Sequence, residues 1–174
     1  AWIAHRFDPA SGKVQFVEVP RARHARIPFL TDEYLGSDAP RVALPVSVAS
    51  RPPAPLHFLF HSAFCCSTLL VRALDRPGAA MGLSEPVILN DIVGWRHRAR
   101  PQPGEVANIA GHALRLLARP WGPGEAVVVK PSNLLNPMAP ALLQLAPNAR
   151  AILLHAPLED FLGSIARKGM WGRL

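Results

Sequence analysis

The segment 61–68 carries the residue types that bind a phosphate or sulfate group. It follows a short apolar run, Leu56–Phe60, and leads into residues with the apolar spacing of a helix. Cys66, Ser67 and Thr68 are small enough for backbone N–H groups to approach an anion, and the two hydroxyl groups can donate to it. The first N–H groups of a helix have no partner within the helix, and the helix dipole attracts negative charge there. An anion-binding loop is one interpretation, and an ordinary helix start with Ser67 or Thr68 as N-cap is the other.

Two familiar kinds of phosphate site do not fit this segment. The ATP- and GTP-binding loop G-x-x-x-x-G-K-[ST] requires glycines at His61 and Cys66 and a lysine at Ser67, and the sequence has none of them. Cys66 and Arg72 have the C-x5-R spacing of cysteine-dependent phosphatases. The residues between them, however, have the pattern of a buried helix and not of a loop that wraps an anion. The sequence therefore disfavours both an ordinary nucleotide-hydrolysing site and a thiol phosphatase.

Polar residues also follow two later apolar runs. The run Ala126–Val129 ends at Lys130, and the run Ala151–Leu154 ends at His155. A helical pattern that contains Ser164 comes next. Open α/β sheets bind ligands at the carboxyl ends of their strands, so we expect these side chains to gather near the segment 61–68.

Alternating strands and helices are predicted to position these residues. From residue 56 onward, the patterns predict strands over 56–60, 80–83, 126–129 and 151–154, and helices over 67–74, 86–93, 106–117, 139–145 and 158–166. Strands separated by helices imply right-handed crossovers, and hence an α/β fold whose parallel sheet is flanked by helices in three layers. Residues 1–55 are expected to form a β-rich lead-in and a Pro-rich linker, with strands over 2–7, 13–19 and 42–48, a short helix over 31–35 and the linker over 51–55.

The composition limits the class of protein. The chain has 174 residues, of which 49% are hydrophobic, and this length is enough for one domain with a core. No apolar run reaches the roughly 18 residues of a membrane span, so no membrane is expected as a partner. A charge close to the N-terminus argues against a signal sequence, and two adjacent cysteines form no disulfide framework, so a cytoplasmic location is expected.

The net charge of +7 favours an anionic partner, but an Arg- and Pro-rich composition also arises from genome bias. We therefore regard nucleic acid as an unlikely partner. The basic run Trp95–Arg100 is interpreted as a solvated loop. The histidines show no spacing of metal ligands, so no metal is expected.

Together these motifs resemble the sulfotransferase superfamily, whose members use 3′-phosphoadenosine 5′-phosphosulfate as co-substrate. Residues 64–70 (Phe-Cys-Cys-Ser-Thr-Leu-Leu) are similar to the family's R-S-G-T-T-L-L loop, which holds the 5′-phosphosulfate. Residues 147–157 are similar to its second motif, a strand that ends in R-D-P before a helix with a serine. The resemblance covers residues 56–168, about two thirds of the chain. It implies a P-loop-like fold and a set of co-substrate contacts: Ser62, Ala63, Phe64, Cys65, Cys66, Ser67, Thr68, His155 and Ser164.

The sequence departs from the family pattern at four places. Phe64 replaces the basic residue of the loop, Cys66 replaces its glycine, and His155 replaces the arginine of the second motif. The serine expected at position 163 follows one residue later, as Ser164. Each change weakens the binding of a triply anionic nucleotide, although Arg72, Lys130 or Arg167 could compensate. Two alternatives therefore stay open: a catalytically degenerate nucleotide- or anion-binding module of the same fold, and a divergent P-loop kinase.

The resemblance also implies catalytic roles. Sulfuryl transfer to a hydroxyl or amine needs in-line positioning and electrostatic support but no metal. Lys130 would stabilise the leaving phosphate oxygen, and Glu85, just before Pro86, would be the general base, with Asp91 as a second candidate. The plainer interpretations are a solvated strand end for Lys130 and a dipole-stabilising carboxylate for Glu85.

The end of the chain bears on the acceptor. The chain ends soon after the second motif, so it is either a fragment or a short relative that an oligomer partner completes, and the small-molecule, glycan or peptide acceptor is not identified. The segment Arg167–Gly172 echoes the R-K-G-x-x-G motif of cytosolic sulfotransferases but lies at a different place in the chain, and is interpreted as coincidence.

Overall fold

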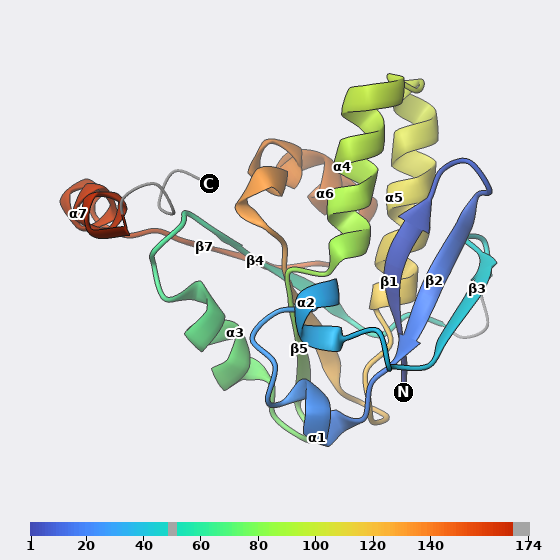
Figure 1. Ribbon diagram of the computed structural model, residues 1–174, viewed down its shortest axis with the longest axis horizontal. Coiled ribbons are helices and arrows are strands. Elements are labelled where there is room, and N and C mark those ends of the chain that lie inside the picture. The colour runs from blue at the N-terminus through green and yellow to red at the C-terminus, as the bar shows by residue number, and fades with distance from the viewer. Residues whose placement is uncertain (49–51, 169–174) are drawn as a thin grey trace.

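Two sheets form the framework of the protein. The computed structural model describes residues 1–48 and 52–168 (Figure 1). Within these ranges, a four-stranded sheet has the order β5-β6-β4-β7, and every neighbouring pair in it is parallel. Its strands are β4 (Leu56–His61), β5 (Ala80–Ser84), β6 (Ala126–Lys130) and β7 (Ala151–Leu154). A three-stranded antiparallel sheet precedes it, with β1 (Trp2–Asp8), β2 (Lys13–Glu18) and β3 (Arg41–Pro45). The predictions of an α/β fold with a parallel sheet and of a β-rich lead-in are confirmed at this level.

Helices cover both faces of the parallel sheet. Figure 1 shows α3 on one side of the sheet and α4, α5 and α6 on the other. The bounds are α1 (Arg21–His24), α2 (Asp32–Leu35), α3 (Ser67–Leu74), α4 (Val87–Ala99), α5 (Pro103–Leu117), the 3-10 helix η1 (Asn133–Met138), α6 (Ala139–Leu145) and α7 (Leu158–Lys168). None of the helices in the described ranges combines the length and the apolar character that crossing a lipid bilayer requires.

Burial explains why these segments form these elements. The central strands β4 and β6 are apolar along their length because helices cover both of their faces, and Leu59, Val127 and Val129 are fully buried. At the edge of the sheet, β7 is largely exposed. Gly82 on β5 lets α3 pack closely, since a Cβ atom there would lie 2.5 Å from the carbonyl oxygen of Val71. The antiparallel sheet packs on α4 and α5 and belongs to the same hydrophobic core cluster as the parallel sheet.

The structure corrects several predicted boundaries. Helix α4 continues to Ala99, so the basic run Trp95–Arg100 lies mainly on a helix and not in a loop. The helix is extended because Trp95 packs on Phe7, with ring centroids 5.8 Å apart, and because its last turn is basic, which suits the negative end of the helix dipole. The third strand ends at Pro45, and α1 and η1 were not predicted. Residues 51 and 169–174, from the predicted linker and the end of the predicted domain, lie outside the described residues.

Asp91 holds the antiparallel sheet to α4. Its carboxylate accepts two hydrogen bonds from the Arg6 guanidinium, each 2.9 Å long, and one from the Phe7 backbone N–H, also 2.9 Å. Both carboxylate oxygens are therefore occupied. We assign Asp91 a structural role, which leaves Glu85 as the candidate base.

Candidate functional site

The topology of the parallel sheet creates a crevice at the carboxyl ends of β4 and β6. These strands are neighbours, yet the chain leaves β4 toward β5 on one side and leaves β6 toward β7 on the other. Ligands in open α/β sheets bind at such a switch point. The loop 62–66 follows β4, and Lys130 ends β6, so both belong to this crevice.

A pocket of ≈ 290 Å³ lies at this crevice. We call it the loop pocket. It combines backbone of the loop with one acidic and two basic side chains. Its lining residues are Phe29, His61, Ala63, Phe64, Cys65, Cys66, Ser67, Thr68, Glu85, Lys130, Asn133 and Lys168.

Backbone strain is concentrated at the loop pocket. In the described part of the chain, four non-glycine residues have a positive φ: Phe64 (58°), Cys66 (60°), Glu85 (51°) and Arg100. The first three of them line the loop pocket. This left-handed conformation is unfavourable for residues with a side chain and is found preferentially where function requires a fixed backbone. At Cys66, where the resembled motif has glycine, the backbone adopts the conformation that glycine favours.

The start of α3 offers free hydrogen-bond donors. Cys66 is the N-cap residue, and no side chain caps the helix. The first backbone hydrogen bond of the helix is donated by the Leu70 N–H to the Cys66 carbonyl, at 3.1 Å. In the part of the chain that the structure describes, the N–H groups of Cys66, Ser67 and Thr68 have no acceptor. The alternative with a serine or threonine N-cap is therefore not observed, and three donors stay available at the positive end of the helix dipole.

Lys130 and Glu85 are in direct contact. The Lys130 side chain is fully buried, and its Nζ donates a hydrogen bond to Glu85 Oε1. The backbone holds the two residues together as well, because the Glu85 N–H donates to the Lys130 carbonyl at 2.7 Å. Burial lowers the pKa of Lys130, and the hydrogen bond and charge of Glu85 oppose this shift in part. The two predicted catalytic residues are thus brought together as an ion pair in the pocket.

Buried and partly buried hydrogen bonds fix the base of the loop. The His61 ring nitrogens lie 2.8 Å from the Ser62 carbonyl and 3.0 Å from the Pro131 carbonyl. The Cys65 thiol donates to the Ser62 carbonyl at 2.9 Å. Ser62 Oγ accepts a hydrogen bond of 3.4 Å from the Ala156 N–H, which links the loop to the end of β7. The loop is therefore held by both neighbouring strands of β4.

His155 and Ser164 do not line the loop pocket. His155 is exposed after β7, and Ser164 on α7 accepts a hydrogen bond of 3.2 Å from Arg167. Helix α7 reaches the pocket through a different residue, Lys168, whose Nζ lies 4.6 Å from the centre of the Phe64 ring. Ser62 is hydrogen-bonded beneath the loop and is likewise not among the lining residues.

Three lining residues were not predicted: Phe29, Asn133 and Lys168. His61 belongs to the predicted segment 61–68 but was not among the expected co-substrate contacts. Asn133 had a local signal, since it shortly follows Lys130. Lys168 belongs to the segment Arg167–Gly172, whose likeness to a sulfotransferase motif is interpreted as coincidence and whose residues 169–172 lie outside the described part. Phe29 comes from the lead-in, where nothing in the local sequence marks it. In the described residues, no group of three His, Cys, Asp or Glu side chains is placed to hold a metal ion.

Cys66→Gly should stabilise the loop. Glycine adopts a φ of 60° without strain, so we expect the free energy of unfolding to rise by about 1 kcal/mol. Urea unfolding followed by circular dichroism measures this change. Cys66→Val should be destabilising, because β-branched residues resist this conformation. A lower stability of Cys66→Gly would mean that the loop does not hold this backbone in solution.

Comparison with known proteins assigns no family. No family model matches the chain, and no curated protein or solved structure is significantly similar to it. The resemblance to sulfotransferases therefore rests on the two motifs. Residues 64–70 form the loop and the first turn of α3, while residues 147–157 lead through β7 toward α7.

Proposed function

We propose that the loop pocket binds the phosphosulfate group of 3′-phosphoadenosine 5′-phosphosulfate, and that the protein transfers the sulfuryl group to a hydroxyl or amine of an acceptor. The observation that carries this proposal is the pairing of free N–H donors at the start of α3 with the buried ammonium of Lys130 in one pocket. Backbone donors at a helix start bind phosphate and sulfate oxygens well. A buried cation acts more strongly on an anion than an exposed one, because water screens it less.

The charges of the pocket suit transfer to a neutral acceptor. As the acceptor oxygen or nitrogen forms its bond to sulfur, the bond between sulfur and the bridging phosphate oxygen breaks, and negative charge grows on that oxygen. Lys130 would stabilise this charge. Glu85 would accept the proton that the acceptor loses, through Oε2, since Oε1 is occupied by Lys130. Within the described residues, Oε2 has no hydrogen-bond partner.

Lys168 supports the binding of a multiply charged anion. It lies over Phe64, the residue that replaces the basic position of the resembled loop, and so supplies a cation close to that position from another element. Arg72 does not play this part, because its guanidinium donates to the Ala25 carbonyl at 3.0 Å and does not line the loop pocket. The contacts of His155 and Ser164 with the 3′-phosphate stay a prediction.

A thermal-shift titration tests the proposal. At 100 times its dissociation constant, adenosine 3′,5′-bisphosphate should stabilise the fold by about 2.7 kcal/mol, whereas ATP and inorganic phosphate should have much smaller effects at equal concentration. A preference for ATP would replace the proposal with a divergent P-loop kinase. Binding of the bisphosphate without transfer to a panel of phenols, sugars and amines would point to the degenerate module. No response to any nucleotide would refute a nucleotide site.

A further inference from the structure

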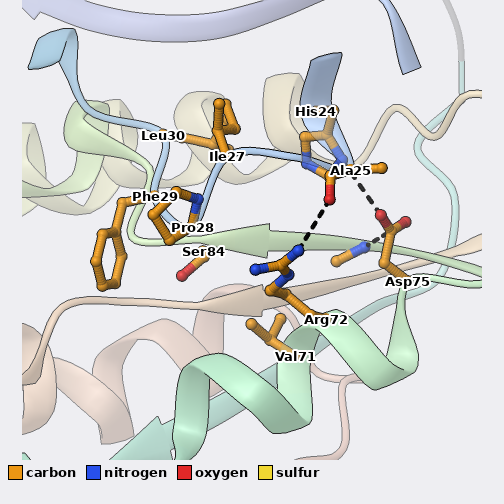
Figure 2. A pocket seen from close by; sticks show the side chains of 11 residues that line it. His24, Ala25, Ile27, Pro28, Phe29, Leu30, Val71, Arg72, Asp75 and Ser84 are labelled. Atoms are coloured by element: carbon orange, nitrogen blue, oxygen red, sulfur yellow. Dashed lines mark hydrogen bonds and ion pairs between the residues drawn. The ribbon is translucent and has the colours of Figure 1, made fainter. Parts of the chain in front are cut away.

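A second cavity lies on the face of the sheet that α3 covers. It has a volume of ≈ 150 Å³ and is enclosed by the segment 24–30, α3 and β5 (Figure 2). Its polar side chains are those of His24, Arg72, Asp75 and Ser84. It shares one lining residue with the loop pocket, Phe29, and none of the residues to which we assign a role there.

One buried polar atom at this cavity lacks a hydrogen-bond partner. Ser84 is 7% exposed, and its Oγ has no partner within the described residues. His24, which is 6% exposed, is paired with Asp75, with Nδ1 3.3 Å from Oδ2. Leaving a buried polar group unpaired is costly, and native proteins satisfy nearly all of them. Ser84 lines a cavity with room for a small molecule, which indicates that the cavity is built to be filled.

The charges in the cavity leave one cation unpaired. Asp75 is engaged on both sides, because it faces His24 and its Oδ1 accepts a hydrogen bond of 3.3 Å from the Gly82 N–H. Arg72 is an exposed residue that lines the cavity; its guanidinium donates to the Ala25 carbonyl through Nη2 alone, and within the described residues it has no carboxylate partner. Figure 2 shows this guanidinium pointing toward the segment 24–30. Arg72 therefore offers its other donors to an anion, and the Ser84 hydroxyl can donate to the same ligand.

We propose that this cavity binds a small organic monocarboxylate of about six non-hydrogen atoms. The carboxylate would be held by Arg72 and Ser84, and the hydrocarbon part would pack on Ile27 and Val71. The size follows from the volume, since an engineered protein cavity of about 150 Å³ holds one benzene molecule. Asp75 disfavours a second negative charge on the ligand, and Arg72 disfavours an ammonium group. This site goes beyond the proposed nucleotide function and does not depend on it.

Three probes of similar size test the charge requirement. Butyrate, butyramide and butylammonium have closely similar sizes and differ in charge. In NMR titrations of the ¹⁵N-labelled chain, butyrate should shift the amide signals of Val71 and Gly82 and leave those of Ser67 and Thr68 nearly unchanged. Butyramide and butylammonium should bind at least about tenfold more weakly, because they lose the charged contact with Arg72. Equal binding of the three probes, or no shift with butyrate at a concentration of about 100 mM, would overturn the proposal in favour of a water-filled cavity.

Matched variants then assign the contacts. Arg72→Gln should weaken butyrate binding about tenfold, and Ser84→Ala about threefold to tenfold, whereas Arg76→Gln, which changes an exposed arginine outside the cavity, should have no effect. Arg72→Lys keeps the charge and should retain most of the binding. It is the control for a loss of binding that comes from a changed conformation of the segment 24–30 in Arg72→Gln, since Arg72 donates to the Ala25 carbonyl. Butyrate binding by Arg72→Gln and Ser84→Ala at the wild-type level would refute the assignment, as would equal weakening by Arg76→Gln.

Discussion

Replacing Lys130 with methionine is expected to weaken the binding of adenosine 3′,5′-bisphosphate by about tenfold to a hundredfold. The 5′-phosphate of this nucleotide is the leaving group of the proposed reaction, and a charge-assisted hydrogen bond contributes about 1.5–3 kcal/mol. Isothermal titration calorimetry measures the change without an acceptor. The same substitution should lower the free energy of unfolding by about 2 kcal/mol, since it leaves the partly buried Glu85 carboxylate without its partner.

The double variant Lys130→Met/Glu85→Gln separates folding from binding. Removing both charges should restore most of the lost stability, because a buried ion pair contributes little net stability compared with neutral residues of similar size. Binding of the bisphosphate should stay weak. Lys13→Gln, on the exposed surface of β2, is the matched control and should change neither quantity. Wild-type affinity of the double variant would show that Lys130 does not contact the nucleotide.

The apolar pattern of the sequence is sufficient to predict the parallel sheet. The runs that form β4 and β6 are apolar because both of their faces are covered, and the predicted bounds of α3 and α6 agree with the structure. The rule that ligands bind at the carboxyl ends of parallel strands places Lys130 beside the segment 61–68, as the structure does. It also predicts His155 and Ser164 there, and neither lines the loop pocket. This level of prediction succeeds because burial dictates residue type within regular elements.

The details of the site depend on contacts that no local pattern encodes. Phe29 reaches the pocket because the lead-in packs beside β5, with the Leu30 N–H donating to the Ser84 carbonyl at 2.9 Å. Lys168 reaches it because α7 meets the loop through Phe161 and Phe64, whose rings are 5.9 Å apart. These are tertiary contacts between segments far apart in the chain. Residue types can be read from the sequence, but their partners cannot.

Backbone conformation marks a second limit of the sequence. Pro86 correctly argues against a right-handed helical conformation at residue 85. It does not indicate that Glu85 adopts a left-handed conformation, with its N–H on the Lys130 carbonyl. Similarly, Ser67 and Thr68 fit the preferences of an N-cap, but the helix has its N-cap one residue earlier, at Cys66. In both cases the surrounding structure overrides the local preference, and the residues concerned line the loop pocket.

Glu125 should be the residue outside the loop pocket whose loss destabilises the fold most. Its side chain is 2% exposed and joins its own turn to two distant segments, since it accepts hydrogen bonds from Arg21 Nη1 at 2.8 Å, the Gly78 N–H at 2.8 Å and the nearby Gly122 N–H at 3.1 Å. Glu125→Ala leaves the Arg21 guanidinium, whose Nη2 is already buried without a partner among the described residues, and two N–H groups unpaired. We expect the free energy of unfolding to fall by about 3 kcal/mol and Tm by about 10 °C, measured by thermal and urea unfolding.

The dependence on pH gives an independent check. The hydrogen bond from Arg21, followed by that from the Gly78 N–H, lowers the pKa of Glu125 below its usual 4.5. The unfolded chain therefore binds a proton at a higher pH than the folded chain does. The stabilisation is fully present above the unfolded pKa and is lost as pH falls through the folded pKa. Glu125→Gln should accordingly flatten the loss of stability below a pH of about 4.5.

The substitution Glu105→Gln, at an exposed helix cap, is the control and should lower the free energy of unfolding by about 1 kcal/mol or less. Equal losses of stability in the Glu125→Gln and Glu105→Gln variants would mean that the buried Arg21–Glu125 pair contributes no more to stability than the exposed helix cap does.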